Sequence, residues 1–207
     1  MDKPKSKPKR KLLPKSPTGI QGLDEITGGG LPKERPTLIC GNAGCGKTLL
    51  SMEFLVRGAT MFNEPGVFIA FEETEQELAK NVESLGFDLE SLISGKQILI
   101  DHIHLERSEI HETGEYDLEG LFIRLNYAID SIGAKRVVID TVESLFAGLP
   151  NAGILRSELR RLFRWLLQQA TIVNAVFGSQ GNSLTDVQSP QQRDRLTALI
   201  FLSVALW

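Results

Sequence analysis

The chain has 207 residues, of which 42% are hydrophobic and 24% are charged, a composition typical of a globular protein with one domain. The formal net charge of −3 excludes a strong positive field that would recruit nucleic acid or an anionic membrane. The longest apolar run, residues 196–207, is too short to span a bilayer, and no apolar signal segment follows the basic N-terminus. We therefore expect no membrane association and, by default, a cytoplasmic location.

Positive charge is concentrated at the N-terminus of the chain. Residues 1–15 contain seven lysines and arginines, one aspartate and almost no apolar side chains. Such a Pro- and Lys-rich segment cannot bury enough apolar surface to fold. We predict a disordered basic tail over residues 1–15 and a single folded domain over residues 16–207. An arm that binds nucleic acid or a partner protein is the alternative interpretation of the tail.

Helices and strands are predicted to alternate along the folded part. Residues 18–27 have the pattern of a short capped helix, and the glycines at 28–30 end it. Helical periodicity or a capping signal indicates further helices over residues 47–60, after Thr74 with its capping-box partner Glu77, over residues 118–132 and over residues 154–168. Short apolar runs typical of buried strands cover residues 36–40, 67–71, 98–101 and 136–140. This alternation predicts an α/β fold with a mostly parallel sheet flanked by helices, and a ligand at the carboxyl ends of the strands.

Residues 41–48 fit the phosphate-loop pattern G-x-x-x-x-G-K-[ST] without a mismatch, and they lie between a predicted strand and a predicted helix. The glycines allow backbone N–H groups to surround a pyrophosphate, and the helix adds its positive N-terminal end. In this pattern Lys47 reaches the β- and γ-phosphates, and the Thr48 hydroxyl ligates Mg²⁺. The sequence therefore predicts a P-loop NTPase that binds ATP and Mg²⁺. Its nucleotide site comprises Gly41, Asn42, Ala43, Gly44, Cys45, Gly46, Lys47, Thr48 and Leu49.

Carboxylates follow two of the predicted strands. Asp140 ends an apolar run in the Walker-B arrangement, in which the carboxylate holds Mg²⁺, directly or through water, near Thr48. Glu72 and Glu73 end the strand at 67–71, where one of them can take a proton from the water that attacks the γ-phosphate. A carboxylate that only caps the next segment, or an acidic helix start, is the structural alternative. We favour Thr48 and Asp140 as metal ligands and Glu72, Glu73 and Lys47 as catalytic residues.

Other polar residues give weaker signals. His102 and His104 share one face of a strand, but no third metal ligand is evident in the sequence. Cys40 ends a strand and Cys45 lies within the phosphate loop, so neither suggests a disulfide or a zinc site. The three arginines at 160, 161 and 164 are expected to form a solvated helix face, with an arginine finger acting on a neighbouring subunit as the alternative.

Several short blocks, in the right order, resemble the KaiC domain, the RecA-like ATPase of circadian clock proteins and their relatives. The blocks are Thr18-Gly19-Ile20, Gly22-Leu23-Asp24, Gly29-Gly30-Leu31-Pro32, Thr37-Leu38, Gly41 to Thr48, Glu64-Pro65-Gly66-Val67-Phe68, Phe71-Glu72-Glu73-Thr74, Gly86-Phe87-Asp88-Leu89, Asn126-Tyr127-Ala128-Ile129 and Arg136-Val137-Val138-Ile139-Asp140. The resemblance covers about residues 17–167. It implies a RecA-type core, slow ATP hydrolysis and assembly as rings, usually hexamers, with nucleotide between subunits. Some members also phosphorylate Ser or Thr of their own chain.

The resemblance also assigns roles to the site residues, and it does not extend to the end of the chain. By match, Lys47 and Thr48 take the phosphate-loop roles, Asp140 takes the Walker-B role, and Glu72 and Glu73 are the paired catalytic glutamates. After residue 167 the family pattern fades, so residues 168–207 are expected to form a divergent or truncated end, although 172–177 and 199–206 have the pattern of strands. The chain has room for only one ATPase repeat.

The sequence therefore predicts a KaiC-like ATPase that binds Mg-ATP and hydrolyses it slowly, in circadian-type or other signalling regulation. The resemblance also implies Ser/Thr autophosphorylation, for which Thr141, Ser144, Ser179 and Ser183 offer hydroxyls, and assembly as a homo-oligomeric ring. A signalling protein is a further expected partner. A catalytically weak ATP-dependent scaffold is one alternative. A DNA-binding ATPase of the RecA class is another, but no loop after Asp140 combines basic with aromatic residues, so we do not expect DNA binding.

Overall fold

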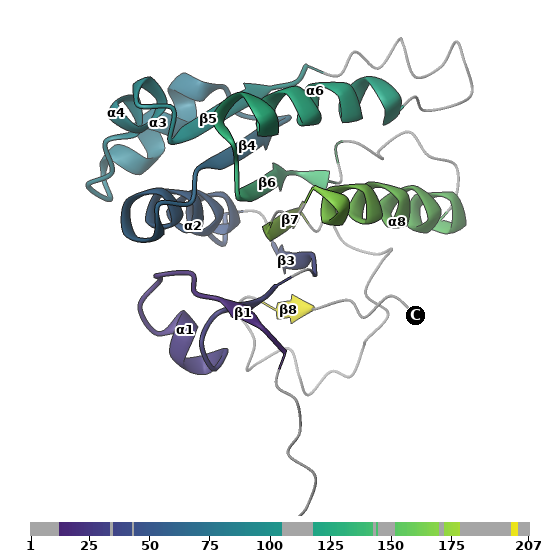
Figure 1. The fold of residues 1–207 in the computed structure, drawn as a ribbon, viewed down its shortest axis with the longest axis horizontal. Coiled ribbons are helices and arrows are strands. Elements are labelled where there is room, and N and C mark those ends of the chain that lie inside the picture. Colours follow the sequence, from purple (N-terminus) through teal and green to yellow (C-terminus); the bar gives the residue numbers. More distant parts are fainter. Residues whose placement is uncertain are drawn as a thin grey trace, which may run out of the picture.

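A six-stranded sheet forms the centre of the protein, with helices on both of its faces (Figure 1). The structure, a computed structural model, describes residues 13–33, 35–42, 44–104, 118–142, 144, 152–169, 172–178 and 200–202. The sheet has the strand order β5-β4-β6-β7-β3-β8, and only β8 runs antiparallel to its neighbour. Its strands are β3 (Thr37–Gly41), β4 (Gly66–Ala70), β5 (Ile98–His102), β6 (Arg136–Asp140), β7 (Ile172–Gly178) and β8 (Ile200–Leu202). The predicted α/β fold with a mostly parallel sheet is confirmed.

The two faces of the sheet support separate hydrophobic cores. Every residue of β4 and β6 is buried, which explains why their sequences are nearly continuous apolar runs. Alternate residues point to opposite faces: Val67 and Ile69 belong to one core, and Phe68 and Ala70 belong to the other. The first core is covered by α6 (Leu118–Ile132) and α8 (Ala152–Gln168). The second is covered by α2 (Lys47–Phe62), α3 (Glu75–Glu83) and α4 (Leu89–Ser94).

The helices match the sequence predictions where periodicity or capping is strong. Helix α6 has the predicted bounds, and the capping box of α3 is present: the Thr74 N–H donates to Glu77 Oε2 at 2.8 Å, and the Glu77 N–H donates to Thr74 Oγ1 at 3.4 Å. Helix α4 was not predicted, because its six residues are too few to show a period. Among the described residues, no helix combines the length and the apolar character needed to cross a bilayer.

The N-terminal segment differs from the prediction. Helix α1 covers only Leu23–Ile26, so a helix over residues 18–27 is wrong for its first five residues. The carboxylate of Asp24 accepts hydrogen bonds from the Thr18 N–H at 2.8 Å, the Thr18 hydroxyl at 2.7 Å and the Gly19 N–H at 2.9 Å, which folds this stretch as a turn. Burial opposes the ionisation of Asp24, but these hydrogen bonds outweigh it and lower its pKa.

Two short strands, β1 (Lys15–Ser16) and β2 (Leu31–Pro32), pair in an antiparallel manner before the main sheet begins. Lys15, which the sequence analysis assigns to the tail, is therefore part of the folded domain and lies opposite Pro32. The rest of the tail up to residue 12 lies outside the described residues.

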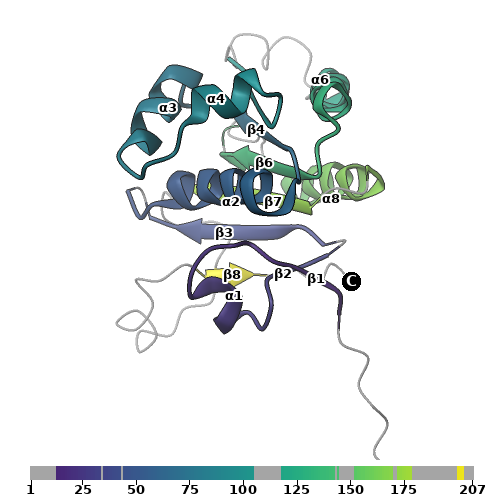
Figure 2. The same cartoon turned by 60° about the vertical axis from the view of Figure 1, so that its left-hand side comes forward.

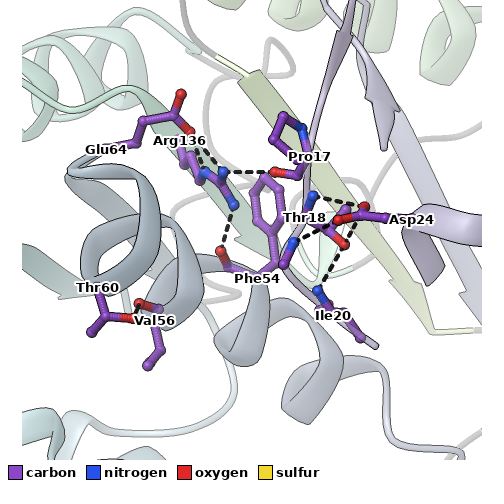
Figure 3. Close-up of polar contacts among 10 residues, drawn as sticks. Pro17, Thr18, Ile20, Asp24, Phe54, Val56, Thr60, Glu64 and Arg136 are labelled. Carbon is purple, nitrogen blue, oxygen red and sulfur yellow. Dashed lines mark hydrogen bonds and ion pairs between the residues drawn. The ribbon is translucent and has the colours of Figure 1, made fainter. Parts of the chain in front are cut away.

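A wholly buried arginine connects this N-terminal segment to the sheet (Figure 3). Arg136 begins β6, and its guanidinium donates hydrogen bonds of 2.8 Å each to Glu64 Oε2, the Phe54 carbonyl and the Pro17 carbonyl. The guanidinium carbon lies over the Phe54 ring, 4.4 Å from the ring centroid. A Cβ on Gly58 would come within 2.5 Å of this side chain, so helix α2 needs a glycine there. The buried charge is thus fully paired, which is the condition for burying it at an acceptable cost.

Replacing Arg136 with alanine should destabilise the domain by about 3 kcal/mol or more, because the change leaves a cavity and removes a hydrogen-bond partner from Glu64 and from the Phe54 and Pro17 carbonyls. Urea unfolding followed by circular dichroism measures this loss. Arg124→Ala is the matched control, since Arg124 is half-exposed in its ion pair with Asp101 and should cost about 1 kcal/mol or less. Equal losses in the two variants would contradict the role assigned to Arg136.

Candidate active site

The three predicted site segments meet at one edge of the sheet. The phosphate loop follows β3, Glu72 and Glu73 follow β4, and Asp140 ends β6. Strands β3, β7, β6 and β4 are parallel neighbours, so their carboxyl ends lie on the same side, as Figure 2 shows for β3 and β6. Ala70 pairs with Asp140, and the Phe71 N–H donates to the Asp140 carbonyl at 2.9 Å, which brings the two acidic segments together.

The phosphate loop depends on glycine at defined positions. Gly44 and Gly46 have φ angles of 75° and 87°, which side chains on L-residues disfavour. A Cβ on Gly41 would lie 2.4 Å from the Cys45 sulfur. Gly46 precedes α2, whose first turn has no side-chain cap and no acidic residue, so its N–H groups suit an anion. Ala43 lies outside the described residues.

Lys47 lies over the phosphate loop, almost completely buried. Its Nζ donates hydrogen bonds of 2.9 Å to the carbonyls of Gly41 and Asn42. These carbonyls hold the ammonium at the centre of the loop, where the sequence predicts the phosphates to bind. A bound phosphate would replace one or both carbonyls as the partner of this charge.

Thr48 and Asp140 are joined directly, although they are 92 residues apart in the chain. The Thr48 hydroxyl donates to Asp140 Oδ2 at 2.6 Å. The other oxygen, Oδ1, is buried and has no hydrogen-bond partner among the described residues. Burial raises the pKa of Asp140 to about 6; the Thr48 hydrogen bond and Lys47 oppose this rise, and the charges of Glu72 and Glu73 add to it.

The unpartnered oxygen fits a bound cation. Thr48, Glu72, Glu73 and Asp140 line a small cavity of about 20 Å³, which is space for one water molecule or ion. Hydroxyl and carboxylate oxygens are the ligands that Mg²⁺ prefers. Within the described part of the chain no three His, Cys, Asp or Glu side chains gather as a metal cluster. Mg²⁺ at a nucleotide needs none, because it binds through one or two protein ligands, water and phosphates.

The two glutamates have different hydrogen-bond partners. Glu72 Oε1 accepts hydrogen bonds from the hydroxyls of Thr141 at 3.2 Å and Ser144 at 3.0 Å, next to the end of β6. Glu73 Oε2 instead accepts from the Asn81 side-chain amide on α3 at 3.0 Å. The sequence predicts the two glutamates as a pair and gives no signal for Asn81 as a partner of one of them. The only signal for Thr141 and Ser144 was their position just after the Walker-B aspartate.

The weaker candidates lie apart from this edge or carry no ligand signal. Arg161 forms ion pairs with Glu119 at 3.5 Å and Glu158 at 3.8 Å, and the arginines at 160 and 164 are exposed, which confirms the solvated helix face. Cys40 and Cys45 are free thiols, and burial raises the pKa of Cys40.

Comparison with known proteins agrees with the motifs and the geometry. The family model "ATPase: KaiC" matches residues 16–193. The circadian clock protein KaiC2 of Synechocystis sp. is 61% identical over 170 residues, which cover 82% of this chain and 30% of that protein. The circadian clock oscillator protein KaiC of Parathermosynechococcus lividus is 42% identical over 75% of this chain, and that of Synechococcus elongatus is 40% identical over 81%.

This chain spans about three tenths of the length of these curated relatives, with 30%, 29% and 32% of the three covered. The family match continues to residue 193, past residue 167, where the recognisable sequence blocks end, and so includes β7 in the middle of the sheet. The extent of the match and the identity to these relatives show that the chain belongs to the KaiC family of RecA-like ATPase domains.

Proposed function

We propose that this domain binds ATP with Mg²⁺ and hydrolyses it slowly. The observation that carries the proposal is the 2.6 Å contact between Thr48 of the phosphate loop and the buried Asp140, whose other carboxylate oxygen has no hydrogen-bond partner among the described residues. That arrangement is what a nucleotide-bound cation requires. Family membership supports the same function, since the matching model describes an ATPase.

The residues divide the work of phosphoryl transfer in this proposal. The backbone N–H groups of residues 41–49 and the Lys47 ammonium bind the phosphates. The Thr48 hydroxyl and the Asp140 carboxylate would hold Mg²⁺, which neutralises charge on the phosphates when it is bound. A water oxygen attacks the γ-phosphorus, the bond to the ADP oxygen breaks, and a carboxylate takes the proton of the water.

Glu72 is the better placed of the two glutamates for that proton. Its carboxylate is exposed to solvent, where it can meet a water and later release the proton, and its Oε1 is held at the end of β6. The Glu73 carboxylate instead accepts its hydrogen bond from Asn81 on α3 and has none from the residues that follow β6 in the described part of the chain. We assign the base to Glu72 and only an electrostatic role to Glu73.

The proposed function also includes assembly of several copies of the chain, autophosphorylation and binding of a partner protein. The relatives' printed names describe circadian clock proteins, which supports a regulatory role for this domain in timing or signalling. We propose assembly with further copies of the chain in a ring, hexameric as the family resemblance implies, and transfer of phosphate to a Ser or Thr as a second outcome of ATP turnover. Nucleotide-dependent binding of a signalling protein would be the output.

The direct test incubates the 207-residue chain with γ-labelled ATP and Mg²⁺, and follows free phosphate and protein-bound label separately. Phosphate release that disappears in Lys47→Ala supports the ATPase, and label retained on the protein adds autokinase activity. ATP that binds without either signal would overturn hydrolysis and favour the ATP-dependent scaffold.

The two glutamates should respond very differently to removal of charge. Glu72→Gln should lower the turnover number about 100-fold or more, the usual contribution of a positioned base, while leaving ATP binding intact. Glu73→Gln should lower it less than about tenfold, because Glu73 acts only through its charge. Phosphate release under single-turnover conditions measures both changes. A larger loss in Glu73→Gln than in Glu72→Gln would reverse the assignment of the base.

Asp140 should give the metal- and nucleotide-free domain a pH-dependent stability. The pKa of Asp140 is about 6 in the folded chain against an ordinary 3.8, so between these values the folded chain binds more protons than the unfolded chain. The free energy of unfolding should therefore fall by about 2–3 kcal/mol as the pH rises from 4 to 7.

Asp140→Asn is neutral at every pH and should lose that part of the slope, so it should be more stable than the wild type at pH 7.5 but not at pH 4. Urea unfolding in EDTA at both pH values measures the difference. Asp130→Asn, at an exposed aspartate of α6, is the control and should keep the slope. The same slope in wild type and Asp140→Asn would contradict the raised pKa.

A further inference from the structure

A triangle of two hydroxyls and one carboxylate lies at the end of β6. Ser144 Oγ is 3.0 Å from Glu72 Oε1, Thr141 Oγ1 is 3.2 Å from the same oxygen, and the two hydroxyl oxygens are 2.9 Å apart. The Ser144 N–H donates to the Thr141 carbonyl at 3.2 Å, so the chain turns directly after Asp140. This turn places both hydroxyls on the side that faces Glu72.

The number of protons decides how this triangle is connected. Two hydroxyls supply two protons, so only two of the three contacts are hydrogen bonds at any moment. The two shortest contacts run from Thr141 to Ser144 and from Ser144 to Glu72. The shortest path is therefore a relay in which Thr141 donates to Ser144 and Ser144 donates to Oε1 of Glu72.

The relay restrains a side chain that would otherwise be free. Glu72 is exposed, and an exposed glutamate samples many rotamers. Holding it in one geometry costs side-chain conformational entropy, which the hydrogen bonds must offset. Thr141 is buried, so its hydroxyl offers Ser144 a fixed partner. The other carboxylate oxygen, Oε2, accepts no hydrogen bond from the described residues. One oxygen of Glu72 is thus anchored while the second stays available to a water.

We propose that Ser144, oriented by Thr141, is a positioning residue that fixes the Glu72 carboxylate for attack of water on the γ-phosphate. The inference rests on the proposed ATP hydrolysis and deepens it, because it explains how one of two adjacent glutamates becomes the base. Ser144 touches neither substrate nor reacting water in this proposal and acts only through Glu72.

The test compares Ser144→Ala with Ser144→Thr and with Ser94→Ala, a control at an exposed serine near the end of α4. Ser144→Ala should lower the turnover number about tenfold, the effect of one lost hydrogen bond, with unchanged ATP affinity. Ser144→Thr keeps the hydroxyl and should recover most of the activity. Ser94→Ala should match the wild type.

A double-mutant cycle isolates the route through Glu72. In the Glu72→Gln background, Ser144→Ala should lower the single-turnover rate by less than about twofold, because the base it positions is already gone. In the nucleotide-free chain, the urea midpoint shifts of the two single variants should sum to more than the shift of the double variant. A tenfold loss from Ser144→Ala in both backgrounds, or additive midpoint shifts, would overturn the proposal.

The outcomes also separate this inference from the proposed function. A wild-type chain that binds ATP but releases no phosphate would overturn both. A wild-type chain that hydrolyses ATP, loses activity in Lys47→Ala and keeps full activity in Ser144→Ala would overturn the positioning role alone.

Discussion

The parallel pairing of β4 with β6 is the constraint on which the site depends. With Ala70 opposite Asp140, the residues that follow each strand must emerge side by side, and the hydrogen bond from the Phe71 N–H to the Asp140 carbonyl continues the pairing one residue beyond β4. A shift of register by one residue would point Asp140 to the opposite face of the sheet. The distance between Glu72 and the hydroxyls after β6 is therefore set by the backbone and not by the side chains themselves.

The electrostatics of the site follow from the close approach of its three acidic side chains. Asp140, Glu72 and Glu73 lie around one small cavity, and burial together with the two neighbouring charges disfavours ionisation of Asp140. Lys47, the cation that could compensate them, is held by the loop carbonyls of Gly41 and Asn42. The site thus holds a concentration of oxygen ligands that the protein alone leaves incompletely paired. In the proposed function a divalent cation would supply the missing positive charge, and because it would also bind the phosphates, binding of metal and of nucleotide would be interdependent.

Sequence alone predicted the parts of the fold that depend on local pattern. The period of α6, the capping box of α3 and the apolar runs of β4 and β6 are properties of neighbouring residues, and each lies where it was expected. The segment before α1 was mispredicted because Asp24 binds backbone N–H groups that precede it, an alternative to helix that propensity does not register.

The parts of the site that escaped prediction depend on contacts between distant segments. Phosphate-loop and Walker-B residues could be named in advance because their spacing is tied to one ligand, and the structure brings Thr48 and Asp140 together. The different environments of Glu72 and Glu73 could not be predicted from the sequence. They follow from the hydrogen bond of Glu73 to Asn81 and from that of Glu72 to Ser144, which lies 72 residues further along the chain. Asn81 and Ser144 form no recognisable sequence pattern with the two adjacent glutamates, so their contacts become evident only in the structure.

Strand β6 shows how the fold divides stability from function within five residues. Arg136 at its start is wholly buried, and its guanidinium hydrogen bonds go to Glu64 and to the carbonyls of Phe54 and Pro17. Asp140 at its end, about 13 Å away along an extended strand, is nearly as buried but keeps an oxygen without a partner among the described residues. A buried charge whose hydrogen bonds are all formed within the protein stabilises one arrangement of the chain. A buried charge that lacks a partner is stabilised only when a ligand binds to it. Arg136 fixes the start of β6 through its hydrogen bonds, and the same strand carries Asp140 at its other end. The hydrogen bonds of Arg136 therefore help to hold Asp140 in position while one of its oxygens remains available to a ligand.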